Sequence, residues 1–507
     1  MTTLQNLYRR YNEHMPLLVV LAFTALLVFF QAFRYTFPLG YAGMYTLIAE
    51  GIAEADFRLP LNIPHYGPGG IGLIYPPFAM YVFALAIKLG IPVWTYLKFA
   101  PAVFSLLAML PFYYLTLELI GSKAAGVVAA ILFLTTPVIY YTHVWSAGVV
   151  RGLALCFCLA GLYFYLRALR NGSRRNLLLA GFFLGLLLTT HWLYIVFAAL
   201  AGMAFLLAER KLAGLRVAFG ILVIALLVAS PWLILILQRH GIANIMMAYS
   251  SHGNVDFFRS LDDIPLALKF VMQNLEYVTG NKFLAALTFP GLILLVMQRK
   301  FHLPLTFLFV LLMGTADIFI QIPAVLMAGA SGAEVFRFAH KNMTSFSAAA
   351  SKPLMPILAV LTAFSIVLSS TQGLSQIIQY QPELDGNSLE TASFVRDNTD
   401  PSATYLFVGK INEAEWFPYL LNRTPVFSLW GSEWKGTYAQ QAEILIELRN
   451  CEIQKSWPCM ESLQQKHSVS PDLLVVPNKR WLIVQLKDTK AWSILYTGER
   501  YVVWERK

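Results

Sequence analysis

Apolar stretches long enough to cross a membrane recur along this chain from Met15 to Ser370 and then stop. A spanning helix needs roughly 20 apolar residues to cross about 30 Å of hydrocarbon. The composition agrees, since 57% of the 507 residues are hydrophobic, 13% are charged and the mean hydropathy is +0.59. We therefore expect a polytopic α-helical membrane protein over residues 1–370, followed by a soluble α/β domain over residues 371–507.

Seven segments meet the length criterion without interruption, and three others do not. The seven are Met15–Phe33, Phe99–Leu117, Ala124–Tyr141, Ala147–Leu166, Leu215–Leu237, Phe283–Met297 and Pro353–Ser370. Phe78–Leu89 is too short to cross alone, and Leu177–Leu207 is interrupted by Thr189, Thr190 and His191. Pro304–Met327 contains Asp317 and Pro323, so the sequence leaves open whether it crosses.

Positive charge orients the predicted spans. After residue 370 lie 14 of the 38 Lys/Arg and 16 of the 28 Asp/Glu, which leaves 24 basic and 12 acidic residues in the membrane part. Short basic loops stay cytoplasmic, and here these are Arg9/Arg10, Lys123, Arg167–Arg175, residues 209–211 and Arg299/Lys300. They share one side only if Phe78–Leu89 does not cross and Leu177–Leu207 enters and returns as two half-depth helices, which must line a cavity. The N-terminus is then cytoplasmic. Segments 34–77, 142–146 and 239–282 lie outside.

The tail has the pattern of a small α/β domain. Helical spacing predicts a helix over Tyr438–Arg449. Strands are predicted at Thr404–Val408, Leu473–Val476, Trp481–Leu486, Trp492–Tyr496 and Tyr501–Trp504. Cys451 and Cys459 lie eight positions apart and can form a disulfide, which needs an oxidising compartment; two free thiols in a cytosolic domain are the alternative. We therefore expect an extracytoplasmic tail.

Several short motifs resemble the glycosyltransferase C superfamily, in the branch of the protein O-mannosyltransferases and lipid A aminoarabinose transferases. In the membrane part these motifs are residues 45–51 (YTLIAEG), 57–60 (FRLP), 75–77 (YPP), 150–153 (VRGL) and 188–191 (LTTH). In the tail, residues 415–418 (EWFP) and 431–434 (GSEW) look like a further pair. The order of elements is similar too, with one span, a long outer loop, many spans and an outer tail.

The resemblance implies an integral-membrane glycosyltransferase, located in the cell membrane, that moves a sugar from a polyprenyl-phosphate donor to a lipid, glycan or protein acceptor on the outer face. Such enzymes generally carry an acidic residue about four positions before the tyrosine that matches Tyr45. The corresponding segment here, Gly40–Gly43, has no acid. A second acidic position of the family corresponds roughly to Ser146–Arg151, which also has none. This departure leaves the identity of the catalytic base open.

The first loop nevertheless offers three carboxylates as candidate bases, because transfer needs a group that takes the acceptor's proton. Asp56 is the first choice, with a loop-capping role as its alternative. Glu50 and Glu54 lie one helical turn apart and therefore share a helix face. In a closed cavity, their repulsion would either raise the pKa of one carboxylate or be relieved by a divalent metal such as Mg²⁺ or Mn²⁺. A solvated helix face is the alternative for both. No metal-ligand motif is present in the sequence.

Candidate substrate-binding residues follow from the charge of the leaving phosphate, which needs cations around it. The cations are Arg58, Arg151, Arg337, His340 and Lys341. Three further candidates are Tyr75, expected beside the sugar, His191, expected to face the cavity, and His65 in the first loop. Arg151 lies inside an apolar run, where an unpaired guanidinium is costly, although it can also snorkel to the surface. Arg337 and His340 share a helix face and can hold a phosphate together, or they belong to a basic surface helix. His191 is a ligand or a hydrogen-bonded structural residue.

Two other functions fit the same pattern. A transporter or flippase of lipid-linked sugars would use broken helices and Asp317 as a coupling residue, but it needs neither a large first loop nor an outer domain. A non-catalytic member that binds lipid-linked saccharides is favoured by the missing acid. Nothing in the sequence indicates binding of nucleic acid.

Overall fold

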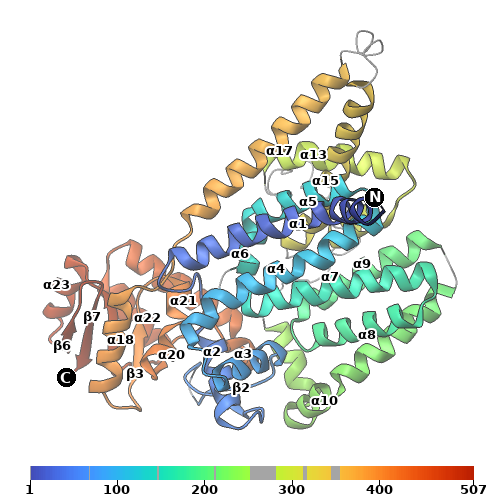
Figure 1. Cartoon of the computed structure of the whole chain (residues 1–507). Helices are drawn as coiled ribbons and strands as arrows, with labels where there is room; N and C mark the ends of the chain where they lie inside the picture. Colours follow the sequence, from blue (N-terminus) through green and yellow to red (C-terminus); the bar gives the residue numbers. More distant parts are fainter. Residues whose placement is uncertain are drawn as a thin grey trace. The chain divides into compact units, whose positions relative to one another are not determined.

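The computed structural model describes residues 2–67, 69–144, 148–210, 213–251, 281–311, 317–343 and 354–507. The chain forms two compact units, which we describe separately (Figure 1). The helical unit comprises residues 1–34, 99–231 and 255–380. The loop–tail unit comprises residues 35–98, 232–254 and 381–507, so the first loop and the tail belong to one body. Two of the boundaries between the units fall within long helices, α4 (Val93–Ile120) and α10 (Ala213–Ser250).

The helical unit is built from apolar helices. They are α1 (Thr2–Arg34), α4 (Val93–Ile120), α5 (Lys123–Thr135), α6 (Pro137–Val144), α7 (Gly148–Asn171), α8 (Arg174–Leu188), α9 (Trp192–Glu209), α10 (Ala213–Ser250), α13 (Lys282–Met297), α14 (His302–Leu311), α15 (Asp317–Met343) and α17 (Leu354–Gln379). Among the described residues, seven helices are long and apolar enough to cross a membrane, or eight if α5 and α6 form one bent span. The chain is therefore a multi-span membrane protein, as expected.

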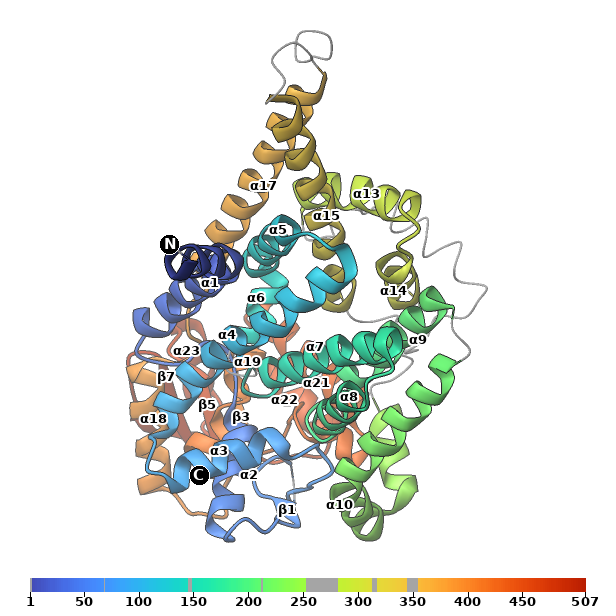
Figure 2. The same ribbon diagram turned by 45° about the vertical axis from the view of Figure 1, so that its right-hand side comes forward.

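Small residues allow these helices to pack closely. The helices α7 and α8 lie side by side in both views (Figures 1 and 2). A Cβ added at Gly161 would lie 2.7 Å from Leu184 Cδ2, and one at Gly291 would lie 1.9 Å from the Met327 carbonyl oxygen. Close backbone approach through small residues is the usual way in which membrane helices associate.

Polar contacts gather at one end of the helical unit. Arg170, at the end of α7, binds Glu118 at 3.1 Å and Glu209 at 2.8 Å. His302 Nε2 lies 2.9 Å from the same Glu209 carboxylate, and Lys300 donates to the Ile120 carbonyl oxygen at 2.7 Å. The loops after α4, α7, α9 and α13 therefore meet at one end, as the charge pattern predicts for loops on one side of the membrane.

The structure changes four of the expected segments. Phe283–Met297 forms α13, whose 16 residues place it among the shorter apolar helices rather than among those long enough to cross. Ala124–Tyr141 is broken into α5 and α6, bent by 73° before Pro137, because a proline inside a helix removes a hydrogen bond. The break between α8 and α9 falls at residues 189–191, as predicted, but α9 has 18 residues and is long enough to cross, so it is no half-depth helix. Pro304–Met327 contains the end of α14 and the start of α15, and residues 312–316 between them lie outside the described part of the structure.

In the loop–tail unit, the first loop folds into α2 (Gly43–Glu54), a hairpin of β1 (Asn62–Ile63) and β2 (Ile71–Gly72), and α3 (Phe78–Lys88). The α3 helix has 11 residues and is roughly 16 Å long, too short to cross alone, as predicted.

The tail is an α/β domain with a five-stranded sheet of order β4-β3-β5-β7-β6. Its strands are β3 (Thr404–Phe407), β4 (Thr424–Pro425), β5 (Leu473–Pro477), β6 (Trp492–Thr497) and β7 (Tyr501–Arg506). Its helices are α18 (Gly386–Asn398), α19 (Ile411–Ala414), α20 (Phe417–Leu421), the 3₁₀ turn η2 (Ser432–Lys435), α21 (Tyr438–Ile453), α22 (Trp457–Lys466) and α23 (Arg480–Asp488). The central β3–β5 pair is parallel, with Leu406 beside Leu474, and β5–β7 and β6–β7 are antiparallel.

Most of the predicted tail elements are present, but the strand predicted at Trp481–Leu486 is wrong. This segment is helix α23, in which Leu482 and Leu486 are fully buried while Val484 is half exposed. The i, i+4 spacing of the buried leucines outweighs the β-branched residues between them. The predicted Cys451–Cys459 disulfide is present.

Candidate functional site

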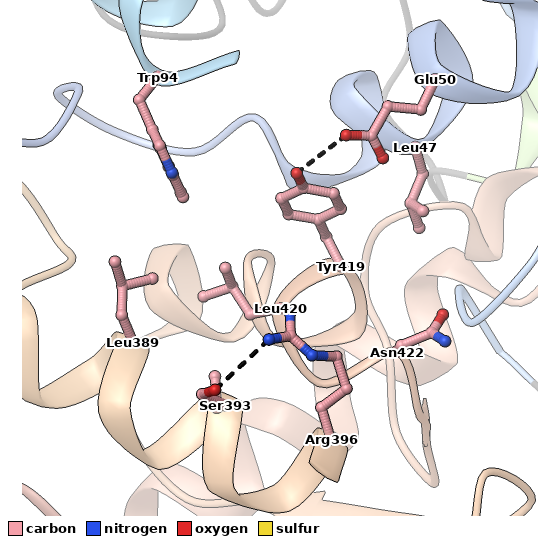
Figure 3. A pocket seen from close by; sticks show the side chains of 10 residues that line it. Leu47, Glu50, Trp94, Leu389, Ser393, Arg396, Tyr419, Leu420 and Asn422 are labelled. Carbon is pink, nitrogen blue, oxygen red and sulfur yellow. Dashed lines mark hydrogen bonds between the residues drawn. The ribbon is translucent and has the colours of Figure 1, made fainter. Parts of the chain in front are cut away.

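A cavity of about 490 Å³ in the loop–tail unit contains Glu50, one of the three candidate bases. The cavity is lined by Leu47 and Glu50 from α2, by Trp94 from the start of α4, and by Leu389, Ala392, Ser393, Arg396, Tyr419, Leu420 and Asn422 from the tail (Figure 3). Apolar and polar side chains contribute equally to the lining, so the cavity suits a ligand that is itself partly polar.

Glu50 is held by a tyrosine from the tail. The Tyr419 hydroxyl donates a hydrogen bond to Glu50 Oε1 at 3.1 Å (Figure 3). Burial raises the pKa of Glu50 above its ordinary value, the Tyr419 hydrogen bond partly opposes this, and the charge of Glu54 adds to the rise. A half-buried carboxylate with a raised pKa in a cavity is a typical candidate for acid–base chemistry.

The cavity also contains a cation. Arg396, on α18, donates to Ser393 Oγ at 3.4 Å and lies 3.3 Å from Asp397 Oδ1. Its side chain is half exposed, and it lines the cavity with Tyr419 (Figure 3). A guanidinium and a carboxylate in one cavity can bind an anionic group and accept a proton.

The other two candidate bases lie outside this cavity. Glu54 is exposed at the end of α2. The Asp56 side chain is 88% exposed, and its carboxylate pairs with Lys88 at 2.9 Å. Asp56 also has a φ of +49°, in the left-handed region that Asp tolerates better than most residues. Glu50 therefore lies in the cavity, whereas Asp56, the first choice from the sequence, lies outside it.

The remaining candidates of the first loop lie in different environments. Arg58 is exposed. His65 Nδ1 lies 3.2 Å from Thr424 Oγ1, and burial lowers its pKa. Tyr75 packs in an aromatic cluster, with ring centroids 5.8 Å from Tyr45 and 6.2 Å from Trp434. None of these three residues is among those that line the Glu50 cavity.

In the helical unit, the structure brings Arg151 and His191 together with His143. The charge of Arg151 acts on both histidines. His143 Nδ1 lies 2.8 Å from the Ile139 carbonyl oxygen, so this nitrogen donates, and Nε2 accepts from the Tyr194 hydroxyl. His191 caps α9, its Nδ1 accepts from Leu193 N at 3.3 Å, and its ring contacts Tyr194. We call Arg151, His143 and His191 the basic cluster.

The basic cluster lies near the start of α7, whereas Arg170 lies near its end. Their separation along the helix is roughly 28 Å at 1.5 Å per residue, about the thickness of the hydrocarbon. Gly148 packs against the His143 carbonyl oxygen, where an added Cβ would lie at 2.3 Å. The cluster is therefore at the opposite end of the helical unit from the Arg170 contacts, as expected for His191.

The last pair of predicted cations, Arg337 and His340, is described only in part. Both residues lie on helix α15, as predicted. The Arg337 side chain is 73% exposed and pairs with Glu334. The side chain of His340 is outside the described part of the structure.

The sequence missed Tyr419 and Arg396, and it noted Glu415 and Glu433 only as motif members. Glu415 is buried, and its two oxygens accept the N–H groups of Gly43 and Met44, each at 2.8 Å. Burial raises its pKa to about 8, although these N–H donors act in the opposite direction. A tail carboxylate thus binds the start of α2, directly after the segment that lacks an acid.

A bound metal is not supported by the geometry. No group of three or more His, Cys, Asp or Glu side chains is placed to hold an ion in the described ranges. Glu50 is the one carboxylate that lines the cavity, while Glu54 is exposed. We therefore derive no step through Mg²⁺ or Mn²⁺.

Comparison with known proteins identifies the architecture. The family model of dolichyl-phosphate-mannose-protein mannosyltransferases matches residues 75–235. ArnT from Cupriavidus metallidurans, bound to undecaprenyl phosphate, superposes with a TM-score of 0.58 at 15% identity over 96% of this chain and 97% of that one. The chain has the glycosyltransferase C fold. No curated protein sequence matches it.

Two further structures support this fold. The archaeal oligosaccharyltransferase AglB from Archaeoglobus fulgidus, in complex with an inhibitory peptide and a dolichol-phosphate, gives a TM-score of 0.62 at 15% identity, over 92% of this chain and 70% of that one. Arabinofuranosyltransferase AftD from Mycobacteria gives 0.57 at 14% identity, over 97% of this chain and 40% of AftD. A structure of an Archaeoglobus fulgidus oligosaccharyltransferase is a complex with zinc and sulfate. These similarities confirm the resemblance found in the sequence.

Proposed function

We propose that this protein is an integral-membrane glycosyltransferase that transfers a sugar from a polyprenyl-phosphate donor to an acceptor on the outer face of the membrane. The observation that carries the proposal is the basic cluster of Arg151, His143 and His191 at one end of a unit built from apolar helices. A charged side chain on a membrane helix is a candidate functional residue. Two proteins of the same fold contain dolichol-phosphate or undecaprenyl phosphate.

The chemistry of the donor explains why such a cluster is useful. A prenyl chain offers no polar group other than its phosphate, so recognition depends on cations that bind the phosphate. The same cations stabilise the charge that develops on the leaving phosphate during transfer. Arg151 supplies a planar donor that suits phosphate oxygens. His191 adds a ring nitrogen next to it, while His143, whose two ring nitrogens bind the Ile139 carbonyl oxygen and the Tyr194 hydroxyl, helps to position these groups.

For the acceptor's proton, we propose Glu50 as the general base in place of Asp56. Glu50 lines a cavity, is half buried and accepts a hydrogen bond from Tyr419. Asp56 is exposed to water and neutralised by Lys88. A carboxylate with a raised pKa is the better base at neutral pH, because its proton affinity is closer to that of the reacting hydroxyl.

One observation favours a second function, that of a non-catalytic protein that binds lipid-linked saccharides. The start of α2 has no acid of its own, and the Glu415 carboxylate bound there is buried by its contacts with Gly43 and Met44. Donor binding without transfer would support this alternative.

Donor binding tests the proposal directly. Full-length protein in nanodiscs is titrated with undecaprenyl phosphate, and the bound fraction is measured by native mass spectrometry. Charge-assisted hydrogen bonds contribute about 1.5–3 kcal/mol each, so we expect Arg151→Gln to weaken binding by about 10- to 100-fold. Arg151→Lys should recover part of the loss, because it keeps the charge without the planar donor.

The matched control is Arg174→Gln, which makes the same substitution at an exposed arginine at the start of α8. It should leave donor affinity unchanged, and thermal melting should show that all variants fold. Equal affinity of the wild type and Arg151→Gln would remove the proposed donor site. Sugar transfer is then assayed with polyprenyl-phosphate mannose and polyprenyl-phosphate arabinose.

A further inference from the structure

Aromatic side chains of the first loop and the tail gather in a second part of the loop–tail unit. Tyr75 lies 5.8 Å from Tyr45 and 6.2 Å from Trp434, with the Trp434 ring at 83° to that of Tyr75. Tyr41 lies 5.5 Å from Trp430. All except Tyr45 are partly exposed, so their rings retain surface for another molecule. We call these five residues the aromatic cluster.

A tight turn holds the two tryptophans in place. Trp430 and Trp434 flank Gly431, whose φ of +83° strongly favours glycine. A Cβ at Gly431 would lie 2.4 Å from Ile71 Cδ1 and 3.3 Å from Tyr66 Cβ. The turn is therefore packed directly against the hairpin of the first loop. A turn packed in this way fixes the backbone that carries both tryptophans, which lowers the entropy cost of binding a ligand there.

Glu433 lies within the same turn, and part of its carboxylate is unsatisfied. Its Oε2 atom is buried and has no hydrogen-bond partner among the described residues. The backbone N–H groups of Gly431 and Glu433 interact with the carboxylate, and its charge acts on the neighbouring Tyr438. A buried carboxylate oxygen without a donor destabilises a protein. A ligand that brings hydroxyl groups would satisfy it.

We propose that the aromatic cluster and Glu433 form a saccharide-binding site, in which the rings of Trp434 and Tyr75 pack against the apolar face of a sugar and Glu433 accepts its hydroxyl groups. Sugars have C–H faces that suit aromatic rings and hydroxyl edges that suit carboxylates. Of these residues, the sequence gave a role only to Tyr75. That the bound sugar takes part in transfer rests on the proposed function. Saccharide binding at the aromatic cluster does not depend on Arg151.

Saccharide binding is measured on the full-length protein in nanodiscs by saturation-transfer difference NMR. The probes are methyl α-mannopyranoside, methyl α-arabinofuranoside and a mannotriose. We expect at least one of them to bind the wild type, and Trp434→Ala to weaken that binding by roughly 3- to 10-fold. Glu433→Gln should weaken it by about 10-fold. Trp434→Phe should recover most of the affinity, because it keeps an aromatic face.

A stability measurement separates a binding role from a structural one. Glu433→Gln should leave the melting temperature unchanged or raise it, because it removes an unsatisfied buried charge while it lowers sugar binding. Trp481→Ala, at another partly buried tail tryptophan, is the matched control and should not change binding. The site would be overturned if the wild type bound none of the three probes. It would also be overturned if Glu433→Gln and Trp434→Ala both bound a probe as tightly as the wild type.

The two proposals fail in different ways. Undecaprenyl phosphate contains no sugar, so Trp434→Ala should bind it as the wild type does. Conversely, Arg151→Gln should keep the NMR signal of the bound saccharide. Loss of both ligands in one variant, with folding intact, would contradict the assignment of separate binding sites.

Discussion

At the scale of single residues, environment distinguishes carboxylates that look alike in the sequence. Glu50, Glu54 and Asp56 lie within seven positions, yet only Glu50 among them lines the cavity and accepts a tyrosine hydrogen bond. Asp56 pairs with Lys88 in contact with water, where an ion pair contributes little. Their roles should therefore separate on mutation.

The first residue-scale prediction is that Glu50→Gln lowers kcat/KM for transfer by at least 100-fold, because the amide cannot take the acceptor's proton. Asp56→Asn, the matched control, should stay within about threefold of the wild type. Both are measured with the sugar donor for which the wild type is active. Full activity of Glu50→Gln would exclude it as the base. A large loss in Asp56→Asn instead would restore the choice made from the sequence.

The second residue-scale prediction concerns pH. The base must be ionised, so kcat/KM should rise with pH through the pKa of Glu50, which burial places above the ordinary value. The Tyr419 hydrogen bond lowers this pKa, so Tyr419→Phe should move the acidic limb of the profile to higher pH. Tyr496→Phe, elsewhere in the tail, should not move it. A shift to lower pH in Tyr419→Phe would contradict the assignment.

The sequence could identify Glu50 but not the residues around it. Tyr419 is 369 positions from Glu50, and no periodicity connects them. Arg396 is an ordinary exposed-helix residue by its pattern. By contrast, Arg151 and His191 carried a signal of their own, because a charge or a helix break in an apolar segment is costly and needs a reason.

At the scale of elements, the start of α2 depends on the tail. The Glu415 carboxylate accepts two helix N–H groups, the Tyr66 hydroxyl donates to the Glu415 carbonyl oxygen at 2.8 Å, and Trp416 Nε1 donates to the Gly40 carbonyl oxygen at 2.7 Å. A carboxylate at a helix N-terminus also interacts favourably with the helix dipole. The first loop and the tail should therefore unfold together.

This contact gives a pH prediction at the element scale. Burial raises the pKa of Glu415 from 4.5 to about 8, so the folded unit binds more protons than the unfolded chain between these values. Its stability should be highest at low pH and fall as pH rises from about 4.5 to 8. Hydrogen exchange of the peptide around Gly43 and Met44, followed from pH 5 to 9 and corrected for intrinsic exchange, should show this loss of protection.

Glu415→Gln should remove most of that dependence, whereas Glu505→Gln, at an exposed glutamate, should retain it. Protection that increases with pH would contradict the prediction. It would mean that the N–H donors of Gly43 and Met44 outweigh burial and keep Glu415 ionised.

The elements themselves could be predicted where one physical signal dominates. The break at Thr189–His191 and the short α3 follow from polar residues and from length. The strand predicted at Trp481–Leu486 was wrong because aromatic and β-branched residues fit both periods there, and burial of Leu482 and Leu486 decided for a helix. The bend before Pro137 was not predicted, because the apolar length of Ala124–Tyr141 alone indicated one straight span.

At the scale of the whole molecule, apolar length and basic loops determine how the chain crosses the membrane. The polar contacts of Glu118, Arg170, Glu209 and His302 lie at one end of the helical unit, and the basic cluster lies at the other. If the positive-inside rule holds, the Arg170 end is cytoplasmic. We then expect the first loop and the tail outside, where the Cys451–Cys459 disulfide can persist.

Cysteine labelling of intact cells tests this orientation. Leu61→Cys in the first loop and Arg175→Cys at the start of α8 place single thiols at exposed positions, in a background where Cys156 and Cys158 are replaced by alanine. A membrane-impermeant maleimide should label Leu61→Cys in intact cells and Arg175→Cys only after the membrane is opened. Labelling of Arg175→Cys from outside would reverse the orientation, and would place the proposed donor site and the transfer reaction on the cytoplasmic side.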